Sequence, residues 1–406
     1  MKAVRYHFSI PKYLLNKGFG RWSSSVYTSP LSSPLSLDDI PDPKLPGDDW
    51  LAVRPVYAGV CGTDLGTITG KTSPALAPFA SFPAALGHEV VGRVVEVGSR
   101  AEGFQAGDRV VVDPWISCRV RGFEPCPPCR EGKPYLCRRA AEGRFGAGMI
   151  IGYCSGLPGG WSERMVVHAS QAFRVPDSLS DEAAVLIEPL AVSLHGVLRA
   201  LSSSGAKERL GEDGSGKNVL VIGAGMIGLG VVAAIRLLGL ACGVTVLGRY
   251  PFQRELAQAL GADRALPSGR SAAVAAAESV TGARIYRPPI GPPVITGGFD
   301  VVFDCVGSSS SVADSLRVAR EHGQVVVLGG AGELEKVDWT FVWSREVEVL
   351  GSCGYGHEPL FGRHTYEVLL DRLQERSDLP LGRLITHKFP LSEYREAIRC
   401  NLERAE

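Results

Sequence analysis

The stretch Asn218-Val219-Leu220-Val221-Ile222-Gly223-Ala224-Gly225-Met226-Ile227-Gly228 decides the fold of this chain. Residues 218–222 form an apolar run with the length and composition of a buried strand. The pattern G-x-G-x-x-G follows directly, and an apolar segment continues to about Leu238 as a predicted helix. A strand, a glycine turn and a helix in this order predict the start of a doubly wound parallel sheet.

The same glycines predict that a dinucleotide binds here. The first glycine makes the tight turn, the second lets the backbone approach the pyrophosphate, and the third lets the helix pack on the strand. The predicted site also includes the two residues that begin the helix and the valine that ends a later predicted strand at residues 301–306. The predicted cofactor-binding residues are therefore Gly223, Gly225, Met226, Ile227, Gly228 and Val306.

Alternating elements continue after the glycine motif. Strands are predicted at 244–247, 301–306 and 325–328, with a helix at 251–260, which indicates an α/β domain. The Pro- and Gly-rich stretch Ile285 to Gly298 is expected to be a loop insertion. A helix at 366–374 is followed by further strand signal.

The end of the second predicted strand bears on the choice of cofactor. An Asp or Glu at this point would bind the ribose 2′-hydroxyl of NAD. This chain has Gly248-Arg249-Tyr250 there, without an acid. Arg249 suits a 2′-phosphate, so the sequence favours NADP over NAD. The alternative is that Arg249 stacks on the adenine or faces solvent.

Length and composition limit the classes of protein that need to be considered. The 406 residues suggest two domains. Lys plus Arg and Asp plus Glu number 43 each, so no charge excess predicts a nucleic-acid or membrane partner. Glycines break the longest apolar run, Val219 to Ile235, and no signal peptide is evident. We therefore expect a cytoplasmic protein.

The amino-terminal part has a different character. A short strand-like stretch opens the chain, and the Ser- and Pro-rich segment Ser23 to Pro46 is expected to be irregular or an inserted loop. Residues 7–35 have no role that the sequence identifies. Residues 51–115 are rich in β-branched residues punctuated by glycines, as in a small barrel.

Three separated segments carry residue types that bind a catalytic metal. They are Cys61 in Cys61-Gly62-Thr63-Asp64, His88 in Gly87-His88-Glu89, and Glu188 in Glu188-Pro189-Leu190. A thiolate, an imidazole and a carboxylate would form an open zinc site with a fourth position for water or substrate. Each residue alone is a weak signal.

Together these motifs resemble the zinc-containing branch of the medium-chain dehydrogenase/reductase superfamily. The resemblance also includes Gly107-Asp108-Arg109-Val110 and covers nearly the whole chain after about residue 36. It implies a GroES-like β-barrel catalytic domain, residues 1–188 and 352–406, and a Rossmann dinucleotide-binding domain, residues 189–351. A homodimer or homotetramer is also implied. Family members continue into a last strand, so we expect this sequence to be truncated or divergent near 404–406.

The resemblance also implies roles for individual residues. Cys61, His88 and Glu188 would bind the catalytic zinc, and Glu89 would be an exchangeable fourth ligand or lie behind the ligands. Asp64 would hold the far nitrogen of His88, and Thr63 would hydrogen-bond the substrate hydroxyl. Many relatives have a histidine in the proton relay where this chain has Gly66, so the relay uses water or ribose alone, or another residue.

The implied activity is zinc-dependent oxidation of an alcohol by hydride transfer to NAD(P). Glu188 is typical of the polyol, glucose and threonine dehydrogenase groups, so we expect a polar small-molecule alcohol: a polyol, a sugar or a hydroxy amino acid. The alternative is an NADP-binding protein with a structural or sensing role and no catalysis.

A second metal site is predicted from cysteines with the spacing C-x7-C-x2-C-x7-C. Four thiolates suit a closed, structural zinc. The family pattern is C-x2-C-x2-C-x7-C, and Phe123 stands where its first cysteine would be. We expect Cys118 to close the site through a longer loop; alternatively three cysteines bind with another ligand, or the site is not used. The four residues are Cys118, Cys126, Cys129 and Cys137.

The other cysteines, and two further histidines, are expected to have packing or structural roles. These histidines are His168 and His195.

Overall fold

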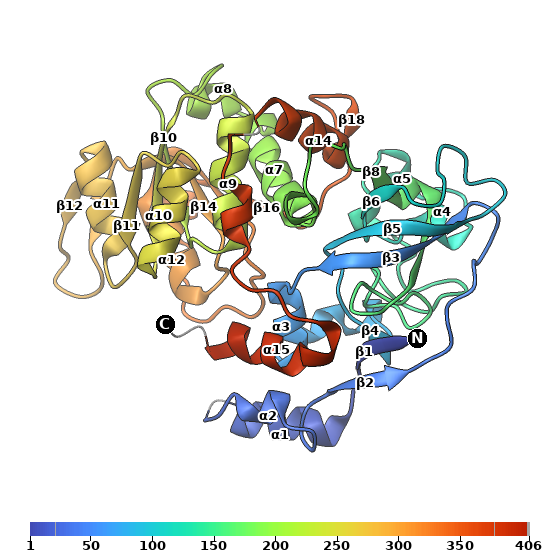
Figure 1. Ribbon diagram of the computed structural model, residues 1–406. Helices are drawn as coiled ribbons and strands as arrows, with labels where there is room; N and C mark the ends of the chain where they lie inside the picture. The colour runs from blue at the N-terminus through green and yellow to red at the C-terminus, as the bar shows by residue number, and fades with distance from the viewer. Residues whose placement is uncertain (21, 377, 404–406) are drawn as a thin grey trace. The chain divides into compact units, whose positions relative to one another are not determined.

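The computed structural model describes residues 1–20, 22–376 and 378–403 (Figure 1). The chain forms two compact units, Met1–Glu188 with Ile385–Glu406, and Pro189–Leu384. The sequence analysis expected boundaries at 188/189 and 351/352, and in these units residues 352–384 group with the second one. The intervening segment belongs to the second unit because it contacts that unit: His195 Nδ1 and Glu358 Oε1 lie 2.8 Å apart, and both groups are buried.

The second unit contains a six-stranded sheet in the order β11-β10-β9-β14-β15-β16. All five pairings are parallel. This order, with the first strand in the middle, is that of a doubly wound dinucleotide-binding sheet. The strands are β9 (Asn218–Ile222), β10 (Gly243–Gly248), β11 (Arg264–Pro267), β14 (Phe299–Asp304), β15 (Ala319–Val327) and β16 (Glu348–Gly351).

Helices connect these strands and cover the sheet (Figure 1). Val219, Leu220 and Val221 of β9 are completely or almost completely buried, as their apolar run predicts. The expected α/β class is confirmed. The helices of this unit are α7 (Ile187–Ser202), which begins at the boundary, α8 (Ala206–Leu210), α9 (Met226–Leu237), α10 (Pro251–Ala259), α11 (Ala272–Thr281), α12 (Ser309–Val318), α13 (Thr340–Ser344) and α14 (Thr365–Glu375).

The expectation of a loop at Ile285 to Gly298 is wrong. β12 (Arg284–Tyr286) and β13 (Val294–Thr296) form an antiparallel hairpin with Ile285 opposite Ile295. Ile295 is fully buried in the core of the unit. Burial of this side chain anchors the hairpin, and the Pro- and Gly-rich residues between the strands form its connection.

The first unit is built on a five-stranded antiparallel sheet in the order β7-β3-β5-β6-β8. Its core holds Trp50, Leu51 and Met165, each at most 1% exposed. The strands are β3 (Trp50–Ala58), β5 (Val90–Val97), β6 (Arg109–Val112), β7 (Met165–His168) and β8 (Ala172–Arg174), and α6 (Asp181–Ala184) follows them. This is the β-rich region that the sequence predicted.

The segment Ser23 to Pro46 is more regular than expected. β1 (Lys2–Tyr6) pairs antiparallel with β2 (Leu35–Asp39), and α1 (Ile10–Phe19) and α2 (Ser25–Thr28) lie between them. β4 (Ala84–Ala85) pairs with the other edge of β1. Tyr27 and Leu35 are buried in one apolar cluster, and this tertiary burial orders a segment whose local composition favours turns.

The carboxy-terminal part also differs from expectation. β17 (His357–Glu358) and β18 (Arg363–His364) are short, and α15 (Tyr394–Glu403) stands where further strand was expected. α15 contacts α2 and α3 (Gly62–Ile68) within the first unit (Figure 1). Tyr394 and Ile398 of α15 are buried there, which explains the helix. The expectation of truncation or divergence near 404–406 concerns residues outside the described ones. Among the helices that are described, none has the length and apolarity needed to cross a membrane.

Candidate active site

Cys61 stands at the N-cap of α3, the short helix that follows β3. The backbone N–H of Cys61 donates to Asp64 Oδ2 over 3.0 Å, so the third residue of the helix caps its start. The Cys61 thiol faces the Thr63 hydroxyl, with Sγ and Oγ1 3.6 Å apart. The local motif thus places the thiol, the hydroxyl and the buried carboxylate around a single helical turn.

His88 and Glu89 immediately precede β5 and complete a group with Cys61. One ligand atom of each residue lies within 4.8 Å of those of the other two. His88 is 5% and Glu89 is 9% exposed. A Cβ on Gly59 would overlap the Glu89 carboxylate, so the glycine leaves the space that this side chain occupies.

Asp64 lies behind His88 and is completely buried. Its Oδ1 is 3.6 Å from His88 Nδ1, which leaves Nε2 for a metal ion. The Tyr153 hydroxyl donates to the same Oδ1 over 2.9 Å. At 3.6 Å the two groups face each other at ion-pair distance, and His88 Nδ1 has no hydrogen-bond partner among the described residues.

Burial and neighbouring charges shift the pKa values of all three side chains in this group. Burial, and then the charge of Glu89, raise the pKa of the Cys61 thiol. Burial also raises the pKa of Glu89. Burial alone would lower the pKa of His88, but Asp64 and Cys61 outweigh it and raise this pKa well above its usual value. A divalent cation between these side chains would stabilise the thiolate and the carboxylate against burial.

Glu188 does not belong to this group among the described residues. It lies in the first turn of α7, is 7% exposed, and is the last residue of the first unit before the boundary. Among the described residues, the carboxylate grouped with Cys61 and His88 is that of Glu89. The sequence spacing could not show which carboxylate, that of Glu89 or that of Glu188, lies near Cys61 and His88, because both were proposed only from the family resemblance.

Thr63 and Gly66 bear on the proton path. Thr63 is exposed at the start of α3, where its hydroxyl can reach a substrate. Beside Gly66, a Cβ would lie 3.1 Å from Thr72 Oγ1. The threonine hydroxyl therefore occupies part of the space next to the position where relatives carry a histidine.

The four cysteines of the lobe come together as expected, Cys118 included. One sulfur from each of Cys118, Cys126, Cys129 and Cys137 lies within 4.8 Å of the others. Burial opposes ionisation of Cys126, but hydrogen bonds from the backbone N–H groups of Arg138 and Cys129 lower its pKa to about 6. Burial raises the pKa of Cys137 to about 11. Four converging thiols suit a structural zinc.

The insertion after Cys118 contributes a buried arginine. Cys118 begins the one-turn helix α4 (Cys118–Arg121), and Gly122 turns the chain back with φ +78°. Arg121 is 3% exposed, and its guanidinium donates to four carbonyl oxygens of the loop that follows Cys137. The acceptors are Ala140, Glu142, Gly146 and Gly148. Through these hydrogen bonds, the longer loop after Cys118 stabilises the rest of the lobe.

The glycine motif has the predicted geometry in the second unit. Gly223 has φ +99°, and a Cβ on Gly228 would collide with the Gly223 carbonyl oxygen, so α9 starts as close to β9 as a glycine allows. Val306 lies against this turn: a Cβ on Gly223 would be 2.6 Å from Val306 Cγ2. The strand before Val306 ends at Asp304, two residues earlier than predicted.

Arg249 directly follows β10 and is exposed, with its guanidinium 5.6 Å from the centre of the Tyr250 ring. Arg254 donates to the carbonyl oxygens of Gly248 and Arg249. The neighbouring strand β11 pairs Pro267 with Gly248, and the exposed Arg270 follows it. Three arginines therefore surround the carboxyl ends of two adjacent strands, where an acidic residue would stand in an NAD site.

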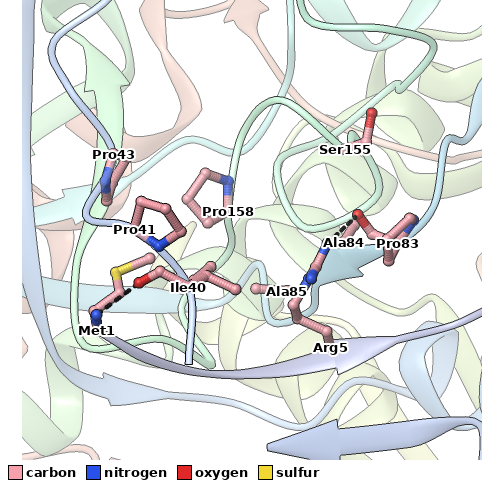
Figure 2. Close-up of a pocket in the computed structure, with 10 residues that line it drawn as sticks. All are labelled: Met1, Arg5, Ile40, Pro41, Pro43, Pro83, Ala84, Ala85, Ser155 and Pro158. Carbon is pink, nitrogen blue, oxygen red and sulfur yellow. Dashed lines mark hydrogen bonds between the residues drawn. The ribbon is translucent and has the colours of Figure 1, made fainter. Parts of the chain in front are cut away.

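A pocket of about 270 Å³ lies elsewhere in the first unit (Figure 2). Four of its ten lining residues are prolines, and the Arg5 side chain that lines it lies 3.5 Å from Asp38. None of the predicted site residues lines it. The chemistry of the chain is concentrated in the two cysteine-containing groups and the glycine turn.

The sequence analysis did not identify two residues of the candidate site, Tyr153 and Asp304. Tyr153 bonds to Asp64, a residue far away in the sequence, so no local pattern reveals it. Asp304 is fully buried and accepts from the backbone N–H groups of Val306 and Gly307. An acid at the end of a buried strand was a visible signal for this second residue.

Known proteins match the chain over most of its length. Residues 47–177 match the alcohol dehydrogenase GroES-like domain, and residues 227–375 match the zinc-binding dehydrogenase family. An L-threonine 3-dehydrogenase of Paraburkholderia phytofirmans is 30% identical over 376 residues, covering 91% of this chain and 92% of the relative. The chain belongs to the zinc-dependent medium-chain dehydrogenase/reductase superfamily.

Solved structures agree with this membership. A zinc-binding dehydrogenase of Sinorhizobium meliloti, solved with NADP, is 30% identical with a TM-score of 0.69, covering 98% of this chain and 94% of that one. Galactitol-1-phosphate dehydrogenase of Escherichia coli has the same fold, with 22% identity, a TM-score of 0.72, and coverage of 100% and 98%. The GroES-like and Rossmann folds are confirmed. The medium-chain dehydrogenase is an NAD(P)-dependent oxidoreductase of the alcohol dehydrogenase type.

Proposed function

We propose that this dehydrogenase oxidises a polar secondary alcohol, a hydroxy amino acid or a polyol, with NADP as the hydride acceptor. The observation that carries the proposal is the group of Cys61, His88 and Glu89, whose ligand atoms lie within 4.8 Å of one another. When bound there, zinc supplies Lewis-acid chemistry that lowers the pKa of a substrate hydroxyl. The similarity to L-threonine 3-dehydrogenases supports a small polar substrate.

In this proposal each residue has a distinct task. Cys61, His88 and Glu89 hold the metal, and Asp64 fixes the ring of His88 through Nδ1. Thr63 accepts a hydrogen bond from the substrate hydroxyl at the exposed start of α3. The second unit binds the dinucleotide, with its pyrophosphate at the amino terminus of α9. The cysteine lobe holds a structural zinc.

The preference for NADP rests on charge. Arg249 is exposed after β10, and Arg254 and Arg270 lie at the same edge of the sheet. A 2′-phosphate would pair with an arginine there, whereas the chain offers no acid for a free 2′-hydroxyl in residues 248–250. The NADP in the Sinorhizobium meliloti structure supports this choice.

The test is a metal assay followed by a hydride-transfer screen of hydroxy amino acids, polyols and sugars with NADP and NAD. We expect about two zinc ions per chain and NADP reduction by one substrate class. Replacing Arg249 by Gln should raise the KM for NADP about 10-fold or more, with little change for NAD. A folded, zinc-free and inactive protein would instead support a non-catalytic NADP-binding role.

Two further properties belong to this proposal because they follow from the resemblance alone. We propose a GroES-like catalytic domain followed by a Rossmann domain from residue 189, and a homodimer or homotetramer. Light scattering on the purified chain measures the oligomeric state directly.

A further inference from the structure

We propose that Tyr153 is a positioning residue of the catalytic metal site, which holds Asp64 in the orientation that fixes His88. This inference rests on the proposed function, since it takes Cys61, His88 and Glu89 as the ligands. The observation behind it is the hydrogen bond of 2.9 Å from the Tyr153 hydroxyl to Asp64 Oδ1, between two buried side chains.

The oxygens of a fully buried carboxylate need hydrogen-bond donors, because water does not reach them. Asp64 has one on each oxygen: the backbone N–H of Cys61 at Oδ2 and the hydroxyl of Tyr153 at Oδ1. The two bonds fix the rotation of the carboxylate. The oxygen that Tyr153 holds is also the one that faces His88 Nδ1, so loss of the hydroxyl would free the carboxylate to turn.

The ring of Tyr153 is itself held firmly. It makes edge-to-face contacts with His88, at 5.9 Å between ring centroids, and with Phe82 at 6.2 Å. The residue belongs to a buried cluster with Leu65 of α3 and Trp161. Such packing leaves the hydroxyl little freedom to leave Asp64.

The Thr67 hydroxyl determines that Tyr153 is the donor in its hydrogen bond to Asp64. Thr67 Oγ1 donates to the Tyr153 oxygen over 3.4 Å and lies 3.2 Å from Thr72 Oγ1. Because the phenol has a single hydrogen, a donor at its oxygen leaves that hydrogen for Asp64. The chain of hydroxyls ends at Thr72, beside Gly66.

The test measures how fast zinc leaves the protein, with a coloured chelator as the probe. Cys61→Ser identifies the zinc of the catalytic site, and the zinc of the cysteine lobe serves as an internal reference. We expect Tyr153→Phe to release the catalytic zinc about 10-fold faster, with the lobe zinc unchanged. The rate of alcohol oxidation should fall, while the KM for NADP remains the same.

Tyr394→Phe is the matched control. Tyr394 belongs to the same buried cluster, and its hydroxyl is buried without a hydrogen-bond partner among the described residues. Equal zinc release from Tyr153→Phe, Tyr394→Phe and the natural protein would overturn the inference. Absence of any zinc outside the lobe in the natural protein would instead overturn the proposed function.

Thr67 gives a second test that does not alter the buried ring. Thr67→Val should accelerate release of the catalytic zinc by about two- to threefold, because the donor to Tyr153 is lost. Thr67→Ser should restore the natural rate. If Tyr153→Phe fails to fold, this pair decides the matter: equal release from Thr67→Val and Thr67→Ser would contradict the inference.

Discussion

The cysteine lobe and the Cys61 group both gather metal-binding side chains in the first unit, but over very different stretches of sequence. All four sulfurs of the lobe come from residues 118–137, which short turns and one-turn helices bring together. The Cys61 group takes its side chains from the N-cap of α3 and from the residues before β5, and Tyr153, from a third segment, donates to Asp64 behind it.

The two groups also differ in the number and type of side chains that could bind a metal. Four thiols leave no position for a substrate, whereas a thiol, an imidazole and a carboxylate leave a tetrahedral metal one open position. The comparison indicates that a structural site can be encoded locally, and that a reactive site depends on the packing of distant segments. The following experiments test that distinction.

Cys61→Ser should have the largest effect on catalysis. We expect kcat/KM for alcohol oxidation to fall about 1,000-fold or more, which corresponds to about 4 kcal/mol of lost transition-state stabilisation. One of two zinc ions should be lost, with little change in circular dichroism. Retention of both ions would show that the metal is held elsewhere.

Cys126→Ser should show the opposite profile. Loss of the lobe zinc should lower the unfolding temperature by about 5–10 °C, because the metal stabilises the folded lobe. At low temperature kcat/KM should stay within about threefold of the natural value. If activity instead falls as far as in Cys61→Ser, the lobe is not merely structural.

Glu89→Gln and Glu188→Gln form a matched pair that decides which carboxylate serves the catalytic metal. Glu89 lies in the group with Cys61 and His88, whereas Glu188 lies outside it. We expect Glu89→Gln to lower kcat/KM about 10- to 100-fold and Glu188→Gln to have the smaller effect. The reverse order would restore the ligand set that the sequence resemblance implied.

Arg121→Met should give the smallest change and probe the lobe alone. The substitution keeps an apolar stem but leaves four carbonyl oxygens without the guanidinium. A loss of about 1–3 kcal/mol in the free energy of unfolding is expected, with faster release of the lobe zinc. Equal acceleration at the Cys61 site would mean that the two groups are coupled.

Much of the second unit was predictable from the sequence. The apolar run 218–222 and the glycines after it define β9, the turn and α9 almost to the residue. The hairpin at Ile285 to Gly298 was not predictable, because its strands are short and are held by the burial of Ile295. The regular structure within residues 1–50 was not predicted either, because burial of side chains such as Tyr27 and Leu35 stabilises it.

The candidate site divides in the same way. The sequence by itself determined the residue types that can bind metal and dinucleotide: the cysteine spacing, the Cys61 and His88 motifs, and the glycine turn. Only the tertiary structure shows that Glu89 is grouped with Cys61 and His88, and that the Tyr153 hydroxyl donates to Asp64. The physical reason is that ligand geometry and the burial of charge depend on side chains packed together from distant parts of the chain, which local patterns do not report.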